Sequence, residues 1–424
     1  YEIHSGDWSS DVCSSDLYYI FIMEHEKILQ DLTVDTDAKI ILLVMDGLGG
    51  LPENGKTSLE AAHTPNLDAL AEKGECGLSE PIFMGITPGS GPSHMALFGY
   101  DPIKYFLGRG ILEALGIDVE VGKGDLVARG NFATHDNDTI VDRRAGRIST
   151  EKNTELCARL NQSLDEVDGV KVRFFPGKEH RFVIKLSASG LSDDLSDADP
   201  QKNGKPKMDA EPLSQSEEAR KTASTVNHII SRITDILDDQ PKANTVLLRG
   251  FSKHPTIPSM QELFKLNPAA IANYPMYRGL AKIVGMTVLD VGTEMEDLFD
   301  VLEAQYHNYN FFYVHVKKTD SYGEDGNYAD KKKIIEATDK FIPRIQKLNS
   351  DVLVVTGDHS TPCVLKSHSW HPNPFLLVSR YALPDKAVRF SERECSQGYL
   401  GRFPALHAVP LMLAHALKMK KFGA

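Results

Sequence analysis

Lys39-Ile-Ile-Leu-Leu-Val-Met-Asp-Gly-Leu-Gly-Gly50 is a continuous apolar run that ends at an aspartate followed closely by glycines. A run of this kind, with glycine directly after it, is more often a strand buried on both faces than a helix. The pattern recurs in Phe311–Val316 and in Val352–Thr356, each followed within four residues by an aspartate. Between these two runs, the pattern of residues 330–348 predicts a helix. The pattern therefore indicates an α/β fold, a doubly wound sheet whose site lies at the carboxyl ends of its strands.

The middle of the chain has a different pattern. Short alternating runs at 170–174, 181–186 and 245–248 predict strands, and residues 215–238 predict one long helix. The polar stretch 187–212 is too long for an ordinary connection, which favours a functional loop or flap. We therefore expect a smaller α+β domain inserted into the first, which would bind substrate or act as a lid. The expected boundaries are 118–270 for the insertion, and 36–117 with 271–424 for the discontinuous main domain.

Composition and charge restrict the class of protein. The chain has 424 residues, of which 41% are hydrophobic and 25% charged, and its net charge is −12. These values exclude disordered, collagen-like and disulfide-scaffold classes. A chain this acidic is a poor candidate for binding nucleic acid or an anionic membrane. Its five cysteines show no CxxC spacing, which favours a reducing, cytoplasmic compartment, and no apolar run approaches the length of a membrane span.

The N-terminal end has a composition of its own. Ser5–Leu17 shows neither helical nor strand periodicity and looks like translated sequencing-adapter read-through. The apolar run Leu17–Met23 lacks the basic leader and the cleavage site of a signal peptide. We expect residues 1–22 to be a non-native extension and Met23 to be the natural start.

Residue types that bind metal ions gather at the predicted strand ends. Each has a plainer interpretation by itself: an aspartate after a strand is often a turn or helix cap, and a single histidine is more often structural. Their joint occurrence favours a metal site, because mixed oxygen and nitrogen ligands suit Zn²⁺ or Mn²⁺, and Mg²⁺ less exclusively. The candidates are Asp46, Asp320, Asp358, His359, His368 and Ser90.

Ser90 lies in the motif Thr87-Pro-Gly-Ser-Gly-Pro-Ser-His94. The proline and glycines allow a tight turn into a helix, which would direct backbone N–H groups at a phosphate. Two metal ions about 4 Å apart can clamp the attacking and leaving oxygens of an in-line phosphoryl displacement. One of them can lower the pKa of the serine hydroxyl, so that Ser90 becomes the nucleophile.

Five motifs together resemble those of cofactor-independent phosphoglycerate mutases, in the shorter archaeal-type branch of the alkaline phosphatase superfamily. The resemblance covers about residues 38–420. The motifs are Val44-Met-Asp-Gly-Leu-Gly49, Pro88-Gly-Ser-Gly-Pro-Ser-His-Met-Ala-Leu-Phe-Gly-Tyr-Asp101, Gly108-Arg-Gly-Ile-Leu-Glu-Ala114, Asp142-Arg-Arg-Ala-Gly-Arg147 and Thr356-Gly-Asp-His-Ser-Thr-Pro362.

The resemblance implies an alkaline-phosphatase-like domain, split around an insertion, and a ping-pong mutase with a phosphoserine at Ser90. It also implies two divalent metal ions, with Mn²⁺ expected and Mg²⁺, Zn²⁺ or Co²⁺ as alternatives, and no bisphosphoglycerate cofactor. The first ion would be held by Asp46, Ser90, Asp358 and His359. The second would be held by Asp320, the residue four positions later, and His368.

The fourth residue after Asp320 departs from the family pattern. The family usually has histidine there, and this chain has Glu324. Glutamate is a competent ligand for Mn²⁺ or Mg²⁺, so we expect it to bind the metal. The alternative is that Glu324 is a loop carboxylate and that this metal site is weakened.

An isomerase must exclude water from the phosphoserine, and the inserted domain is the natural lid for that purpose. Such a lid should carry cations that bind the phosphate and carboxylate of phosphoglycerate, a small-molecule substrate. Asp197 and Asp199, in the polar stretch, are candidate acid/base groups. The candidate substrate-binding residues are Arg143, Arg147, Arg249, Arg278 and Lys282.

The expected activity is the metal-dependent interconversion of 3-phosphoglycerate and 2-phosphoglycerate, a step of glycolysis and gluconeogenesis. Two alternatives stay open. The chain can be a phosphohydrolase or another phosphomutase of the same superfamily. A phosphohydrolase would release more phosphate than it forms isomer. It can also be a degenerate paralogue that binds phosphorylated ligands without turnover and forms no phosphoserine.

Overall fold

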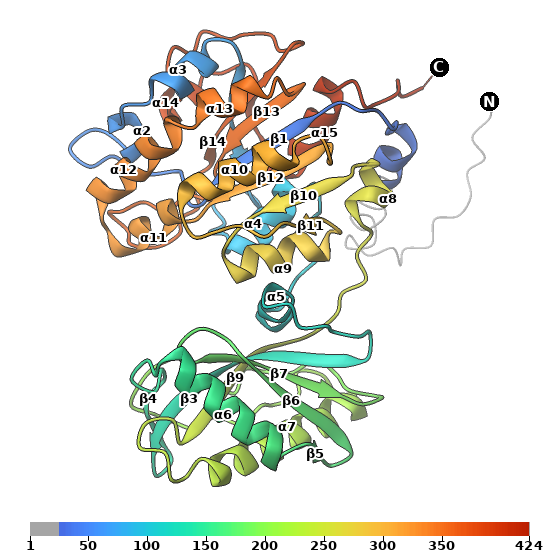
Figure 1. Ribbon diagram of the computed structural model, residues 1–424, viewed down its shortest axis with the longest axis vertical. Helices are drawn as coiled ribbons and strands as arrows, with labels where there is room; N and C mark the ends of the chain where they lie inside the picture. The colour runs from blue at the N-terminus through green and yellow to red at the C-terminus, as the bar shows by residue number, and fades with distance from the viewer. Residues whose placement is uncertain (1–24, 424) are drawn as a thin grey trace, which may run out of the picture. The chain divides into compact units, whose positions relative to one another are not determined.

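The computed structural model describes residues 25–423 and divides them into two compact units (Figure 1). The prediction that residues 1–22 are a non-native extension falls outside this range. Of the described residues, unit 1 comprises 25–106, 258–272 and 284–423. Unit 2 comprises residues 107–257 and 273–283.

Unit 1 is built on an eight-stranded sheet in which only β14 runs against the other strands. All six residues of β1 are fully buried, which is why this strand is apolar throughout. The strands predicted near residues 40, 311 and 352 are confirmed. In sheet order the strands are β11 (Thr287–Val288), β10 (Pro268–Ile271), β12 (Phe311–Val316), β1 (Ile40–Met45), β13 (Val352–Thr356), β14 (Asn373–Ser379), β2 (Glu75–Glu80) and β15 (Gly401–Pro404).

The register of β1 brings three strand ends to one edge. β1 pairs in parallel with β12 on one side and with β13 on the other. Met45 lies opposite Val316, and Val44 lies opposite Thr356. The segments that follow these strands therefore leave the sheet at the same edge, where a doubly wound fold places its site.

Helices of unit 1 cover the sheet, and one prediction about them is wrong. Residues 330–348 form two helices, because Pro343 stands in the first turn of the second helix and has no N–H to continue the ladder of the first. The helices are α2 (Ser58–Ala61), α3 (Pro65–Ala71), α4 (Ser90–Leu97), α8 (Met260–Phe264), α10 (Met295–Gln305), α11 (Lys318–Asp325), α12 (Tyr328–Asp339), α13 (Ile342–Lys347), α14 (Glu392–Cys395), the 3-10 helix η1 (Ala405–His407) and α15 (Ala408–His415).

Unit 2 contains an antiparallel sheet of seven strands, in the order β5-β6-β7-β3-β4-β8 with β9 paired to β3. The predicted strands and the long helix are confirmed as β6, β7, β9 and α7, whereas α6 was not anticipated. The elements are α5 (Arg109–Gly116), β3 (Asp125–Asp136), β4 (Thr139–Asp142), α6 (Thr150–Ser163), β5 (Glu166–Val167), β6 (Val170–Pro176), β7 (Arg181–Ser187), β8 (Lys205–Pro206), α7 (Glu217–Ile236), β9 (Thr245–Lys253) and α9 (Pro275–Ile283).

The boundaries of unit 2 differ from the expected 118–270. Helix α5 belongs to unit 2 because it packs on β3 and β9, where the Ile111 backbone N–H donates to Ser252 Oγ at 2.8 Å. Helix α9 belongs with it, because Gly279 lets the helices approach until a Cβ there would lie 2.1 Å from the Leu112 carbonyl oxygen. Residues 258–272 instead belong to unit 1, since β10 pairs with β12.

Within residues 25–423, no helix combines the length and the apolar composition needed to cross a bilayer.

Candidate active site

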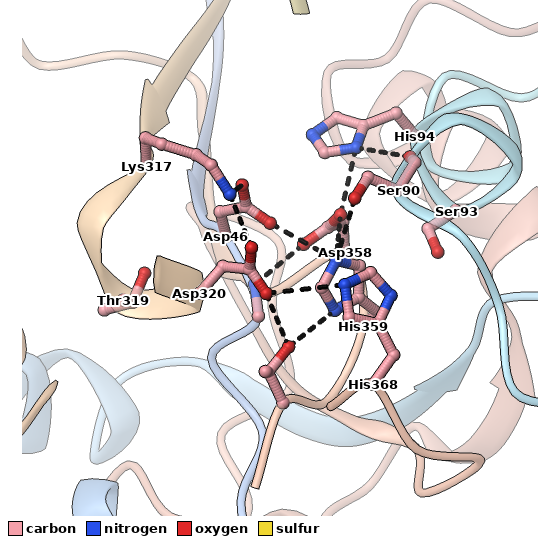
Figure 2. Close-up of polar contacts among 12 residues, drawn as sticks. Asp46, Ser90, Ser93, His94, Lys317, Thr319, Asp320, Asp358, His359 and His368 are labelled. Carbon is pink, nitrogen blue, oxygen red and sulfur yellow. Dashed lines mark hydrogen bonds and ion pairs between the residues drawn. The ribbon is translucent and has the colours of Figure 1, made fainter. Parts of the chain in front are cut away.

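Carboxylate and imidazole side chains converge at the edge of the unit 1 sheet where β1, β12 and β13 end (Figure 2). Ligand atoms of Asp46, Asp358 and His359 all lie within 4.8 Å of one another. The same holds for Asp320, His359 and His368, so His359 belongs to both groups. The structure thus gathers, from four separate stretches of chain, the acids and histidines that the sequence singled out.

Ser90 is the first residue of α4, directly after its N-cap Gly89. The Ser90 hydroxyl oxygen lies 3.2 Å from Nε2 of His359. One turn later, Nδ1 of His94 lies 2.9 Å from the Ser90 carbonyl oxygen and 3.1 Å from Asp358 Oδ2. The N-terminus of a helix favours negative charge, so this position suits both a deprotonated serine and a phosphate attached to it.

Hydrogen bonds fix which nitrogen of His359 faces the carboxylates. The Thr361 hydroxyl donates to Asp320 Oδ1 at 2.7 Å, and it therefore accepts from His359 Nδ1 at 3.0 Å. Nε2 of His359 then lies 3.2 Å from Asp358 Oδ2 and 3.3 Å from Asp46 Oδ1. Histidine ligands of metals are commonly oriented in this way, by a hydrogen bond from the nitrogen that does not bind the ion.

His368 is likewise oriented by a hydrogen bond from its Nδ1 atom. Its Nδ1 donates to the Pro88 carbonyl oxygen at 2.9 Å, and its Nε2 lies 3.5 Å from Asp320 Oδ1. The His368 ring stacks on the His359 ring with centroids 3.7 Å apart. Two oriented imidazoles among buried carboxylates form a donor set that fits divalent cations of the Mn²⁺ or Zn²⁺ type.

Glu324 lies one turn after Asp320 on α11, at the rim of this cluster. Its side chain is 56% exposed, and its Oε1 is 3.9 Å from Nε2 of His368. Partial desolvation and the nearby Asp320 carboxylate raise the pKa of Glu324 above its usual value. Glu324 belongs to neither group of closely spaced ligand atoms, so its role as a metal ligand stays a prediction.

Lys317 is a member of the cluster that the sequence analysis did not identify. Its Nζ lies 2.9 Å from Asp46 Oδ2 and 2.5 Å from Asp320 Oδ2, and thus joins the carboxylates of the two groups. Burial alone would lower the pKa of the Lys317 ammonium, but these two carboxylates outweigh it and raise the pKa. The signal in the sequence was its position, directly after the apolar run and three residues before Asp320.

Buried charges of opposite sign perturb the pKa values of this site. Burial would raise the pKa of Asp46, but Lys317 and the imidazoles of His315 and His359 hold it well below its usual value. Burial would lower the pKa of His359, but the Asp358 and Asp46 carboxylates raise it to about 9. Without a metal ion, the three carboxylates Asp46, Asp320 and Asp358 are therefore balanced only in part, by one ammonium and one imidazolium.

The candidate substrate-binding cations all lie in unit 2, where they fall into separate groups. Arg143 donates to both oxygens of Asp199, at 2.8 and 2.5 Å, and Nη1 of Arg249 lies 3.5 Å from the same carboxylate. Burial would raise the pKa of Asp199, but Arg143 holds it below its usual value, which argues against an acid/base role. Asp197 instead accepts from the Gly250 backbone N–H at 2.8 Å.

The other three candidates do not join Arg143 and Arg249. Arg278 and Lys282 lie one turn apart on α9, and both contact the carboxylate of Asp118, whose side chain is 64% exposed. Arg147 is exposed and has a positive φ of 53° in the turn after β4.

The sequence analysis missed three further arginines: Arg109 and Arg129, which lie near Arg249, and Arg181, which lies near Arg129. Arg129 of β3 is directly opposite Arg249 of β9, and like charges at such positions repel each other. Burial and the positive charges of Arg181, Arg249 and Arg109 lower the pKa of Arg129. Within the described residues, buried Nε atoms of Arg129 and Arg181 have no hydrogen-bond partner. This arginine cluster has the chemistry of a site for an anion.

Comparison with known proteins gives one consistent result. A family model described as 2,3-bisphosphoglycerate-independent phosphoglycerate mutase matches residues 71–243. The chain is 54% identical over 404 residues to a probable enzyme of that name from Thermosipho africanus, and 52% identical over 403 residues to one from Thermotoga maritima. In each case the match covers 95% of this chain and 100% of the relative.

Solved structures agree with these relatives. A Pyrococcus horikoshii protein is 29% identical with a TM-score of 0.78, and the match covers 91% of this chain and 99% of that one. A cofactor-independent phosphoglycerate mutase from Thermoplasma acidophilum is 31% identical with a TM-score of 0.68, covering 89% of this chain and 100% of that one.

The raised pKa of His359 predicts how the stability of the metal-free protein depends on pH. A group whose pKa rises on folding stabilises the protein below its unfolded pKa of about 6.5, and this contribution is lost as the pH passes through the folded value of about 9. In the presence of chelator, the free energy of unfolding should fall by about 2 kcal/mol between pH 7 and 9. Denaturant titrations of the wild type and of His359→Gln measure it. The variant should lack this fall, and an equal fall in both proteins would contradict the assignment.

Proposed function

Because the chain belongs to the 2,3-bisphosphoglycerate-independent phosphoglycerate mutase family, we propose that it interconverts 3-phosphoglycerate and 2-phosphoglycerate through a phosphoserine on Ser90. One observation carries the assignment of the nucleophile. The Ser90 hydroxyl lies at the start of α4, 3.2 Å from a histidine that belongs to both groups of metal-type ligands.

The activity requires two divalent metal ions in this proposal, with Mn²⁺ as the expected ion. Asp46, Ser90, Asp358 and His359 would hold the first, and Asp320, His368 and Glu324 would hold the second. The closely spaced ligand atoms and the two oriented imidazoles support this division. When bound, the ions supply positive charge that lowers the pKa of the serine hydroxyl and neutralises the transferred phosphoryl group.

Phosphoryl transfer then occurs twice at the same serine. The Ser90 oxygen attacks the phosphorus of 3-phosphoglycerate, the bond from phosphorus to the C3 oxygen breaks, and the proton lost by Ser90 ends on that oxygen. The C2 hydroxyl of the glycerate next attacks the phosphorus of the phosphoserine, the bond from phosphorus to the Ser90 oxygen breaks, and the proton lost by the C2 hydroxyl ends on the Ser90 oxygen. Backbone N–H groups at the start of α4 stabilise the phosphate, and the Lys317 ammonium adds positive charge beside Asp46 and Asp320.

Unit 2 supplies the groups that bind the anionic substrate in this proposal. The facing pair Arg129 and Arg249 supports it, since an anion between two arginines would relieve their repulsion. Arg143 shares Asp199 with Arg249 and so belongs to the same region. Arg147, Arg278 and Lys282 also stay proposed substrate-binding residues, although Asp118 already neutralises the last two in part.

The proposal predicts that Ser90→Ala abolishes turnover and that chelation does the same to the wild type. The full chain is assayed for 2-phosphoglycerate formation with Mn²⁺ and then with EDTA, and the phosphoenzyme is trapped with labelled substrate. Ser93→Ala is the matched control, because Ser93 lies one turn along α4 and its hydroxyl donates to the Gly89 carbonyl oxygen. This control should form the phosphoenzyme.

Three results would change the proposal. Turnover by Ser90→Ala would remove Ser90 as the nucleophile, and activity unaffected by EDTA would remove the metal ions. Release of phosphate in excess of isomer would identify a phosphohydrolase instead of a mutase.

The position of Glu324 makes a separate prediction about metal affinity. If Glu324 binds the second ion, Glu324→Ala should weaken Mn²⁺ binding by about tenfold or more, and Glu324→His should restore it, because histidine also suits Mn²⁺. Asp325→Ala, at the next residue, controls for the loss of a carboxylate. Calorimetric titration with Mn²⁺ measures all four proteins, and equal affinities would place Glu324 outside the ligand set.

A further inference from the structure

Lys331 of α12 is a buried lysine that the proposed reaction does not use. Its side chain is 0% exposed, and Nζ donates to the carbonyl oxygens of Gly47 at 2.7 Å, Thr361 at 2.8 Å and Gly49 at 3.2 Å. An ammonium has three donors, so all of them are used, and every acceptor is backbone. Within residues 25–423, no carboxylate lies within ion-pair distance of Lys331.

The three carbonyl groups belong to the two loops that carry proposed metal ligands. Gly47 directly follows Asp46, whereas Thr361 lies two residues after His359. The loops also contact each other: the Gly47 N–H donates to Asp358 Oδ1 at 3.0 Å, and the Thr361 N–H donates to the Gly49 carbonyl oxygen at 3.0 Å. Lys331, which belongs to α12, therefore binds both the loop that follows β1 and the loop that follows β13.

The contact between the loops leaves little room for movement. Gly47 has a positive φ of 62°, and a Cβ there would lie 2.5 Å from Thr361 Oγ1 and 2.9 Å from Asp320 Oδ1. The Thr361 hydroxyl bonds to both Asp320 and His359. Lys331 thus binds the carbonyl oxygen of Thr361, and the Thr361 hydroxyl orients the proposed ligands Asp320 and His359.

A buried charge is costly unless polar groups compensate it, and here carbonyl dipoles do so. An unbranched apolar side chain such as methionine would fill most of the space, but it would leave the three carbonyl groups without this donor. Replacing Lys331 by an apolar residue therefore tests the contribution of the ammonium, because the packing of the side chain is largely kept.

We propose that Lys331 is a positioning residue of the site, whose ammonium fixes the loop after β1 against the loop after β13. The separation of these loops sets the distance between Asp46 and the pair Asp358 and His359, and hence the affinity for the metal ion. The inference rests on the proposed metal-dependent function.

The test replaces Lys331 by methionine and, as a matched control, replaces Lys333 of the same helix, whose side chain is 70% exposed. Mn²⁺ affinity of the full chain is measured by calorimetric titration at a temperature where circular dichroism shows each protein to be folded. Lys331→Met should weaken Mn²⁺ binding by about 10- to 100-fold, whereas Lys333→Met should change it by less than about twofold.

Hydrogen exchange of the metal-free proteins gives a second readout that does not depend on the ion. Lys331→Met should speed exchange in peptides that cover residues 46–50 and 358–363, and leave β6 and β7 of unit 2 unchanged. If Lys331→Met does not fold, Lys331→Gln is used instead, because glutamine keeps two donors but carries no charge. The same changes in Mn²⁺ affinity and in hydrogen exchange are then expected.

The outcomes separate the inference from the function on which it rests. Wild-type Mn²⁺ affinity in the variant, or faster exchange throughout both units without a change in affinity, would overturn the positioning role. A wild type that binds neither Mn²⁺ nor the alternative ions Mg²⁺, Zn²⁺ and Co²⁺ would refute the metal-dependent function. The exchange of the two loops would still decide whether Lys331 fixes them.

Discussion

Three carboxylates buried at one edge of a parallel sheet are the constraint on which this structure depends. Asp46, Asp320 and Asp358 are each at most 2% exposed, and buried charges of one sign are tolerated only when opposite charges compensate them. In the metal-free protein, Lys317 and the His359 imidazolium compensate two of these three charges. Divalent ions would replace part of this compensation, so the same charge requirement both shapes the site and suits it to the metal ions of the proposed function.

The fold meets this requirement with few elements. Parallel pairing of β1 with β12 and β13 delivers the acids to one edge, and the start of α4 brings Ser90 beside His359. Hydrogen bonds between the loops, together with those of the Lys331 ammonium to both, then set their separation in the proposed positioning role. Unit 2 contributes a different chemistry, an arginine cluster suited to an anion, which would match the phosphate and carboxylate of the proposed substrate.

The sequence contained the strands and their terminal acids, because apolar runs and the residues after them are local features. Contacts made by tertiary structure left weaker signals. Lys317 becomes important only when Asp46 and Asp320 meet, and Lys331 binds backbone carbonyl groups, which have no signature in the sequence. Arg129 occupies an ordinary strand position until β9 places Arg249 opposite it. The boundaries of unit 2 depend on close contacts between helices, such as the one at Gly279, and these contacts also could not be predicted from the sequence.

The most direct test of the central claim is to locate metal ions in the folded protein. Crystals grown with Mn²⁺ should give an anomalous difference map, recorded above the manganese absorption edge, with two peaks at the edge of the unit 1 sheet. One peak should contact Asp46, Asp358 and His359, and the other should contact Asp320 and His368. A map without density among these side chains, in a protein that is fully active, would contradict the account.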